Sequence, residues 1–478
     1  MRSAVLLVLL LALAAGSNAQ SLRPEQMSEE VERVRKLVHG WHPDPYGCRT
    51  RAEVDALFDT LRVQCALPLP AEDYHELMSI ALAGICDGAT CALPPPSWEK
   101  RLRTTEPLLP LQVRIIEGGL FVDAETKGFR SLPRGSRILS IDGNESRVVL
   151  QRLERLVSAD GCAMEARHRA IERDFAVLYR MVFGEVGRHM VTYEASEGER
   201  LTQVIVPLSR EEMEHTRGPK PPEHAPWRYV VDEDGGTAWV ELTTFDRAEL
   251  EHAGVRAARF TDELAGVLRK RHIRHLVLDV RGAAGMDVHA AEVVTALFAA
   301  APFRSLQHIQ ARNITPPEDA RVSAELLALT DLLRSSFAPV SSGVYRPVVE
   351  LPGMAMAQPR TKDGFTGRVY VVQDAATRDA AALLAMHVER SGHGTTFGGS
   401  TGSGAAHFCA GVRMTVPLKY SGVVVEMPVL RFDPADPPGT AECTGVAPQH
   451  RVEQLAQALV NGRDSVRQAV LMAIQALR

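Results

Sequence analysis

The sequence predicts an α/β protein whose largest part is a buried sheet, preceded by a helical region and by a smaller module with several strands. Two patterns support this prediction. Apolar residues recur at helical spacing between residues 26 and 87. From residue 229 onward, short and almost wholly apolar runs alternate with helical stretches, which is typical of strands covered by helices.

The composition excludes several classes of protein. Of the 478 residues, 45% are hydrophobic and 24% charged, so the chain is neither disordered nor fibrous. At roughly 100 to 200 residues per domain, this length corresponds to a multidomain protein. Lys and Arg number 54 against 59 Asp and Glu, which gives a net charge of -5 without any run of like charges. Nucleic acid is therefore excluded as a partner, because the basic surface that it requires is missing.

The first 19 residues indicate an export signal. Arg2 precedes an apolar stretch over residues 4–15, and residues 17–19 have the small-x-small pattern of a signal-peptidase site. We expect cleavage after Ala19. The apolar stretch is shorter than the ~20 residues of a membrane span, and no comparable run follows. The mature protein is therefore expected to be soluble and either periplasmic or extracellular.

Three or four amphipathic helices are predicted at the start of the mature chain, over residues 26–87. The proline-rich segment 92–96 ends this region, because proline removes a backbone donor and disfavours helix at the residue before it. We therefore place an N-terminal helical domain over residues 20–100.

The next part, residues 101–215, combines strands with a helical stretch over residues 148–182. Strand-like runs lie at 113–116, 120–122, 137–141 and 204–206. Residues 132–143 partly resemble the "GD-x-I-x-x-I-N-G" element of PDZ domains, which bind peptide carboxylates. The resemblance implies a degenerate PDZ-like module with a helical insert, in which Arg130 and Arg134 hold the carboxylate of a peptide.

The core is predicted over residues 228–478. Its strands and helices alternate as follows: strand 238–242, helix 248–270, strand 275–280, helix 288–300, strand 369–372 and helix 380–389. Residues 303–365 have poor periodicity. They are interpreted as an insertion with a single helix over residues 324–335.

Five segments in the same order resemble the C-terminal processing, or tail-specific, serine peptidases. Residues 369–404 are similar to the strand, helix and glycine-rich loop around the nucleophile of that family. The other four segments resemble its motifs "HP-x-x-Y", "DGHT", "LDLRGNGGG" and "E-G-x-GV-x-PD" and lie at residues 42–46, 87–90, 278–282 and 442–449. The resemblance implies a crotonase-like β/α spiral core that acts on protein tails and uses no cofactor.

The charged residues of the family are mostly replaced in this chain. Asp379 stands at the position of the nucleophilic Ser, and Ala89 stands at the position of the base. Residues 400–403 contain no Lys for a Ser-Lys dyad, and only Glu442 matches the family's charged set. Acyl transfer needs a nucleophilic oxygen and a base within hydrogen-bond reach. The resemblance therefore implies the loss of peptidase activity.

The backbone beside the predicted oxyanion site also departs from the family. Gly285 and Met286 follow two alanines where the family has consecutive glycines, and Ala380 follows the nucleophile position. Since Asp379 precedes a helix, the simplest interpretation makes it an N-cap whose carboxylate accepts the N–H groups of Ala381 or Ala382. A carboxylate there repels an oxyanion.

A displaced nucleophile is the alternative. Ser400 and Ser403 lie in a flexible glycine-rich loop, and His407 follows closely, so a shifted Ser-His pair is conceivable. Gly/Ser loops are, however, far more often ordinary turns.

The cysteines are expected to form disulfides, because all seven follow the export signal. A hairpin of the runs 412–416 and 423–430 is expected to bring Cys409 and Cys443 together. For Cys86 and Cys91 a local disulfide is favoured, since the spacing is not CxxC and no His lies at zinc-finger distance. No metal site is predicted.

Cys86 with Cys91 or Cys48 with Cys65 are expected as further pairs. An odd number of cysteines leaves at least one unpaired, and Cys162 is expected to be that free thiol.

Three function classes follow. The favoured one is an exported peptidase homologue that has lost its chemistry and binds a peptide or a protein C-terminal tail. The second is an active serine peptidase with a displaced nucleophile. The third is a structural subunit of an exported complex, with no open cleft.

Overall fold

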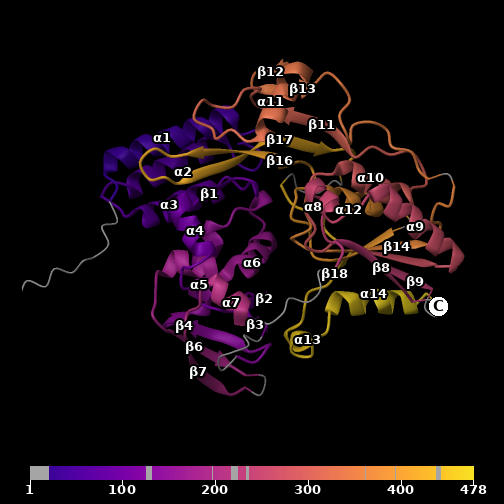
Figure 1. Cartoon of the computed structure of the whole chain (residues 1–478), viewed down its shortest axis with the longest axis horizontal. Helices are drawn as coiled ribbons and strands as arrows, with labels where there is room; N and C mark the ends of the chain where they lie inside the picture. The colour runs from indigo at the N-terminus through magenta and orange to yellow at the C-terminus, as the bar shows by residue number, and fades with distance from the viewer. Residues whose placement is uncertain are drawn as a thin grey trace, which may run out of the picture.

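A computed structural model of the chain is shown in Figure 1, and it describes residues 21–124, 132–195, 198–216, 224–232, 236–360, 362–392, 394–437 and 443–477. The predicted export signal lies outside these residues. The described part contains three six-stranded sheets with helices packed against them. It is therefore a mixed α/β structure, as the sequence predicts.

Three helices begin the described chain: α1 (Pro24–Trp41), α2 (Arg51–Gln64) and α3 (Ala71–Ala83). Each buries an apolar stripe, and α2 begins with a capping box in which Thr50 and Glu53 satisfy each other's backbone N–H groups. After strand β1 (Cys91–Leu93) comes the short helix α4 (Pro96–Arg103), which has proline at its first turn. The prediction of three or four helices is correct.

The module that follows is an antiparallel sheet of order β2-β3-β4-β6-β7, with β5 beside β4. Its strands are β2 (Gln112–Ile116), β3 (Gly119–Ala124), β4 (Arg137–Ile141), β5 (Asn144–Glu145), β6 (His189–Glu194) and β7 (Arg200–Ile205). Helices α5 (Ser146–Leu156) and α6 (Met164–Phe183) cover it, with a 3-10 turn at Asp160–Cys162 between them and α7 (Arg210–Thr216) after β7.

The core sheet has the order β18-β15-β14-β10-β9-β8 and is parallel except for β8. Its strands are β8 (Trp227–Asp232), β9 (Thr237–Leu242), β10 (His275–Asp279), β14 (Arg368–Gln373), β15 (Gly394–Gly398) and β18 (His450–Arg451). The carboxyl ends of five neighbouring parallel strands therefore meet at one edge, where ligand sites of such sheets lie.

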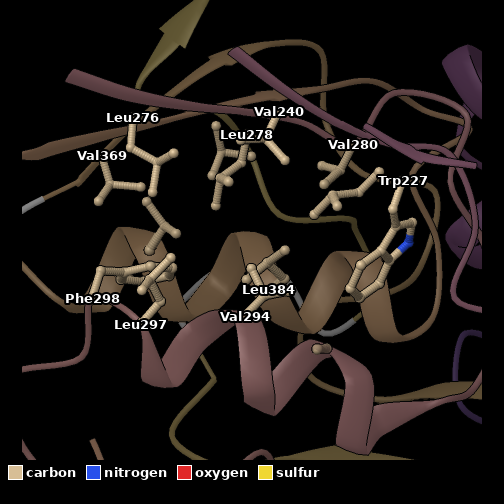
Figure 2. Close-up of a cluster of buried hydrophobic side chains, with 14 of the residues drawn as sticks. Trp227, Val240, Leu276, Leu278, Val280, Val294, Leu297, Phe298, Val369 and Leu384 are labelled. Atoms are coloured by element: carbon tan, nitrogen blue, oxygen red, sulfur yellow. The ribbon is translucent and has the colours of Figure 1, made fainter. Parts of the chain in front are cut away.

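Helices α10 (Val288–Ala296) and α12 (Ala380–Arg390) cover one face of this sheet. Figure 2 shows Leu276, Leu278 and Val369 of the strands pointing toward Val294 and Leu384 of the two helices. All five side chains are buried. At about 25 cal/mol per Å² of buried apolar surface, this layer is a principal stabilising contact of the core.

The predicted helix over residues 248–270 is wrong in one respect. The chain forms two helices, α8 (Arg247–His252) and α9 (Ala257–Lys270), which are separated by a turn at Gly254. Gly254 has φ +68°, a left-handed conformation that ends a helix and that glycine adopts without steric cost.

The prediction that residues 303–365 form an insertion with one helix is also incomplete. The helix is α11 (Ala324–Ser336), but three strands lie beside it: β11 (Leu306–Ala311), β12 (Phe337–Ser341) and β13 (Val344–Pro347). They join β16 (Phe408–Pro417), β17 (Val424–Pro434) and β1 in an antiparallel sheet. Strands β12 and β13 are short and mostly half-buried or exposed, so they carry no clear apolar alternation.

The N-terminal helices pack on this sheet, as Figure 1 shows for the indigo helices beside the yellow strands β16 and β17. The core that they share combines Met27 and Phe58 with Met414, Val425 and Met427. The last helices are α13 (Ala456–Val460) and α14 (Ser465–Gln475). Among the described residues, no helix is both long and apolar enough to cross a membrane.

The predicted cysteine pairs are wrong. The disulfides join Cys48 to Cys443 and Cys86 to Cys162. The hairpin of β16 and β17 does form, but Cys409 lies in it as a buried free thiol while the chain after β17 carries Cys443 to the loop before α2. Cys65 and Cys91 are also free, so Cys86 does not pair with Cys91, nor Cys48 with Cys65, and Cys162 is not free.

Candidate active site

Asp379 lies at a sharp turn between strand β14 and helix α12. Its backbone has φ +56° and ψ -125°, a conformation that residues other than glycine rarely adopt. The turn before it is fixed by Thr377, whose hydroxyl donates to the carbonyl of Val280 at 2.9 Å. This conformation projects the side chain of residue 379 away from the helix axis and toward the loop after β10.

Asp379 is the N-cap residue of helix α12, as predicted, but its carboxylate makes no capping hydrogen bond, so the expected bonds from Ala381 or Ala382 are absent. Its Oδ2 accepts the N–H of Gly285 at 3.1 Å. Its own N–H donates to Oγ of Ser403 at 2.8 Å, and that hydroxyl lies 3.5 Å from Oδ1. The carbonyl of Arg378 takes the capping role, since it accepts the N–H of Ala381 at 3.1 Å.

The backbone that was predicted to form the oxyanion side is already engaged within the chain. The Gly285 N–H binds Asp379, and the Ala380 N–H donates to the carbonyl of Gly285 at 3.0 Å. Gly285 has φ +115°, and a Cβ there would lie 2.2 Å from the backbone nitrogen of Asp246. The Met286 side chain lies beside Gly411 of β16, since a Cβ on Gly411 would lie 3.9 Å from Met286 Cγ. The Asp379 carboxylate thus occupies one of the N–H donors that the sequence predicted on the oxyanion side.

Ala89, which stands at the position predicted for the base, is 1% exposed. Carboxylate groups hold the loop around it through hydrogen bonds. The N–H of Ala89 donates to Oδ1 of Asp87 at 3.2 Å. Nε2 of His42 lies 2.8 Å from Oδ2 of Asp87. Nδ1 of His42 accepts the N–H of Asp44 at 3.1 Å, so Nε2 carries the proton and donates it. Both nitrogens of this fully buried His42 are therefore committed to structure.

Asp160, which the sequence did not single out, connects the two halves of the site. Its carboxylate accepts the N–H of Gly88 at 2.7 Å and the N–H of Gly404 at 3.3 Å. Gly88 precedes Ala89, and Gly404 follows the Ser403 that contacts Asp379. Burial raises the pKa of Asp160 to about 6, while the Arg378 guanidinium lowers it and Asp87 raises it further.

The raised pKa of Asp160 makes stability depend on pH. Because the folded-state value of about 6 exceeds the ~3.9 of an unfolded Asp, the folded protein holds the proton more tightly. The contribution is fully present below pH ~4 and is lost as the pH rises through about 6. We expect the stability of wild type relative to Asp160→Asn to fall by on the order of 2 kcal/mol from pH 4 to pH 7.

Urea unfolding at several pH values measures this difference, with Asp331→Asn on the exposed side of α11 as the control for a changed surface charge. The prediction would be contradicted if the free energy of unfolding of wild type, relative to that of Asp160→Asn, stayed constant from pH 4 to 7.

Within the described part of the chain, no hydrogen bond joins Ser400 or Ser403 to His407, so the displaced Ser-His pair does not form. Ser403 is fully buried and bonded to Asp379, whereas Nε2 of His407 lies 3.0 Å from Oδ2 of Asp44. Ser400 lies in the same loop without a hydrogen bond to either. The loop brings these residues into one region, but within the described residues His407 makes no hydrogen bond to either serine.

Two predicted site residues, Glu442 and Arg130, lie outside the described residues. Arg134 is described, and its guanidinium lies 3.3 Å from the carboxylate of Asp123. It lines a cavity of about 510 Å³ between the module and the carboxyl edge of the core sheet. Other lining residues come from β2, from α6 and from the ends of β14 and β18, among them Arg114, Arg169, Asp374 and Arg451.

Ion pairs cross this cavity between the module and the core. Arg169 of α6 lies 3.6 Å from Asp374 after β14, and Glu165 of α6 pairs with Arg451 of β18. On the β2 edge, the backbone N–H of Ile115 donates to Glu172 at 2.7 Å. The cavity therefore has polar, charged walls.

Two solved structures of mature CPAF share this fold. Mature CPAF has a TM-score of 0.65 at 11% identity, with 95% of this chain and 98% of that chain covered. Mature CPAF complexed with lactacystin gives the same values. The photosystem II D1 C-terminal processing protease matches at 16% identity over 93% of this chain and 98% of its own, with a TM-score of 0.41. No protein family and no curated protein matches the sequence. The chain has the fold of CPAF, and the predicted resemblance is confirmed at the level of fold.

Proposed function

We propose that this protein is a peptidase homologue without hydrolytic activity, which binds peptides or the C-terminal tails of proteins. One observation carries the proposal: the Asp379 carboxylate occupies the nucleophile position and binds the Gly285 amide that an oxyanion would need. Buried Ala89 stands where the base would lie. Loss of a nucleophile typically costs about a millionfold in turnover.

The proposal includes the finer features predicted from the sequence. The core is a crotonase-like β/α spiral, residues 101–215 are a degenerate PDZ-like module, and the protein is exported through its first 19 residues. Support comes from the antiparallel module sheet with its covering helices, and from the two disulfides, which persist in oxidising compartments.

A fluorophosphonate probe tests the loss of chemistry, because it labels an activated serine covalently. We expect no labelling of the purified wild type above the level of heat-denatured protein. The Ser403→Ala variant is the matched comparison, since Ser403 is the buried hydroxyl at Asp379. Labelling of wild type that disappears in Ser403→Ala would establish an active peptidase with a displaced nucleophile.

Peptide binding is tested separately by titration. Each peptide ends in an apolar residue and is prepared in two forms, one with a free C-terminal carboxylate and one with an amidated C-terminus. The affinities of the two forms are compared, since PDZ-type recognition depends on the carboxylate. We expect the free form to bind at least about tenfold more tightly, a difference of ~1.4 kcal/mol, and Arg134→Ala to remove this preference. Arg137→Ala, on the exposed end of β4, is the control. Equal affinity of both peptides would rule out carboxylate recognition by the module.

A further inference from the structure

A second cluster of chemically active side chains lies beside the Asp87 loop and lines one cavity together with Asp87 and Asp160 of the candidate site. Cys48, His407 and Cys443 each offer one ligand atom, and these three atoms lie within 4.8 Å of one another. Nε2 of His407 is in addition 3.0 Å from Oδ2 of Asp44. Two sulfurs, one imidazole nitrogen and one carboxylate oxygen form a donor set that zinc binds in proteins.

The cluster also encloses space for an ion. A cavity of about 20 Å³ is lined by all four of these residues. A cavity of at least ~10–15 Å³ accommodates one water, and a zinc ion with its bonds directed to the walls needs no more. The Cα atoms of Cys48 and Cys443 are 5.7 Å apart, so both sulfurs reach the same point.

We propose that Cys48, Cys443, His407 and Asp44 form a tetrahedral zinc site once the Cys48–Cys443 disulfide is reduced. A phosphine supplies two electrons and water supplies two protons, which convert the disulfide into two thiols while the phosphine becomes its oxide with the oxygen of the water. Zinc binding then releases both thiol protons, while neutral His407 binds through Nε2 and keeps its ring proton on Nδ1.

The distances suit this exchange. Ligands about 2.0–2.1 Å from a tetrahedral zinc lie roughly 3.3 Å from each other, close to the present separation of His407 and Asp44. Thiolates at about 2.3 Å from zinc must lie roughly 3.7 Å apart, and breaking the S–S bond permits this. Arg431, 3.1 Å from Asp44, holds that carboxylate in its charged form. Zinc would thereby preserve the link between residues 48 and 443 under reducing conditions.

The experiment measures zinc uptake by the full chain before and after reduction with a phosphine, using a chromophoric chelator as competitor. We expect one additional zinc ion per chain after reduction, and none at this site in the oxidised protein. Cobalt in place of zinc should give the near-ultraviolet charge-transfer band of thiolate ligands. His407→Ala keeps both cysteines, and we expect it to weaken binding on the order of 100-fold.

Other thiols provide the controls. Cys409 lines the same cavity, and reduction also frees Cys86 and Cys162. We expect Cys409→Ser and the double variant Cys86→Ser, Cys162→Ser to bind zinc as the wild type does. Asp44→Asn tests the fourth ligand if His407→Ala does not fold. Equal zinc uptake by oxidised and reduced protein would overturn the proposal, as would unchanged affinity in the His407 and Asp44 variants.

Discussion

Wild-type protein, Asp379→Ser and Ala89→His are all expected to leave casein unhydrolysed, and only the double variant is expected to show weak turnover. A serine at 379 alone lacks a proton acceptor, and a histidine at 89 alone lacks a nucleophile. Replacing Asp379 also frees the Gly285 amide, so the double variant regains a base, a nucleophile and a donor together. Steric limits keep the turnover low, because Ala89 is fully buried.

Hydrolysis is measured on unfolded casein, with heat-killed protein as the background. Ser400→Ala and Ser403→Ala are included as matched controls in the wild-type sequence. Wild-type turnover that either of these variants abolishes would contradict the proposed inactivity and identify the nucleophile. Turnover by Asp379→Ser alone would show that a base other than residue 89 reaches the site.

Gly285→Ala is expected to lower the free energy of unfolding by about 3–5 kcal/mol, at the high end for a single mutation, because the new Cβ forces the backbone to rearrange. A Cβ at residue 285 would lie 2.2 Å from the nitrogen of Asp246 and 2.3 Å from the carbonyl carbon of Phe245. The backbone angle of φ +115° adds strain for any other residue. The loop must shift, and with it the amide that binds Asp379.

Gly282→Ala is the matched control, because it lies three residues earlier in the same loop. Its φ is +74°, but a Cβ there would meet nothing within 4 Å. We expect a cost of about 1 kcal/mol from backbone strain alone. Denaturant unfolding measures both variants, and equal losses would show that the close approach to Phe245 and Asp246 is not the cause.

The fold could be predicted where a segment's own residues determine its environment. Strands β10 and β14 are continuous apolar runs, and α12 follows the second of them, so local pattern alone locates all three. Strand β1 has only three residues and pairs with β17 through Cys91 and Glu426. Such pairing depends on chain segments hundreds of residues away, which local periodicity does not report.

The sequence located the residues of the candidate site but did not show which groups their side chains contact. The motifs located Asp379 and Ala89, but the direction of the Asp379 carboxylate depends on a left-handed backbone angle and on Gly285, 94 residues away. Asp160 had no signal in the sequence, since a lone Asp in a turn is usually solvated. The disulfide of Cys48 and Cys443 closes over 395 residues, where no spacing rule applies.

The packing of the N-terminal helices on strands β16 and β17 constrains how the protein is made. The apolar face that Met27 and Phe58 contribute is completed by Met414, Val425 and Met427, which the ribosome adds more than three hundred residues later. At about 5–20 residues per second, that face stays uncovered for tens of seconds after its synthesis. The helices therefore reach their native state only after translation is nearly complete, and until then they are a target for chaperones and for aggregation.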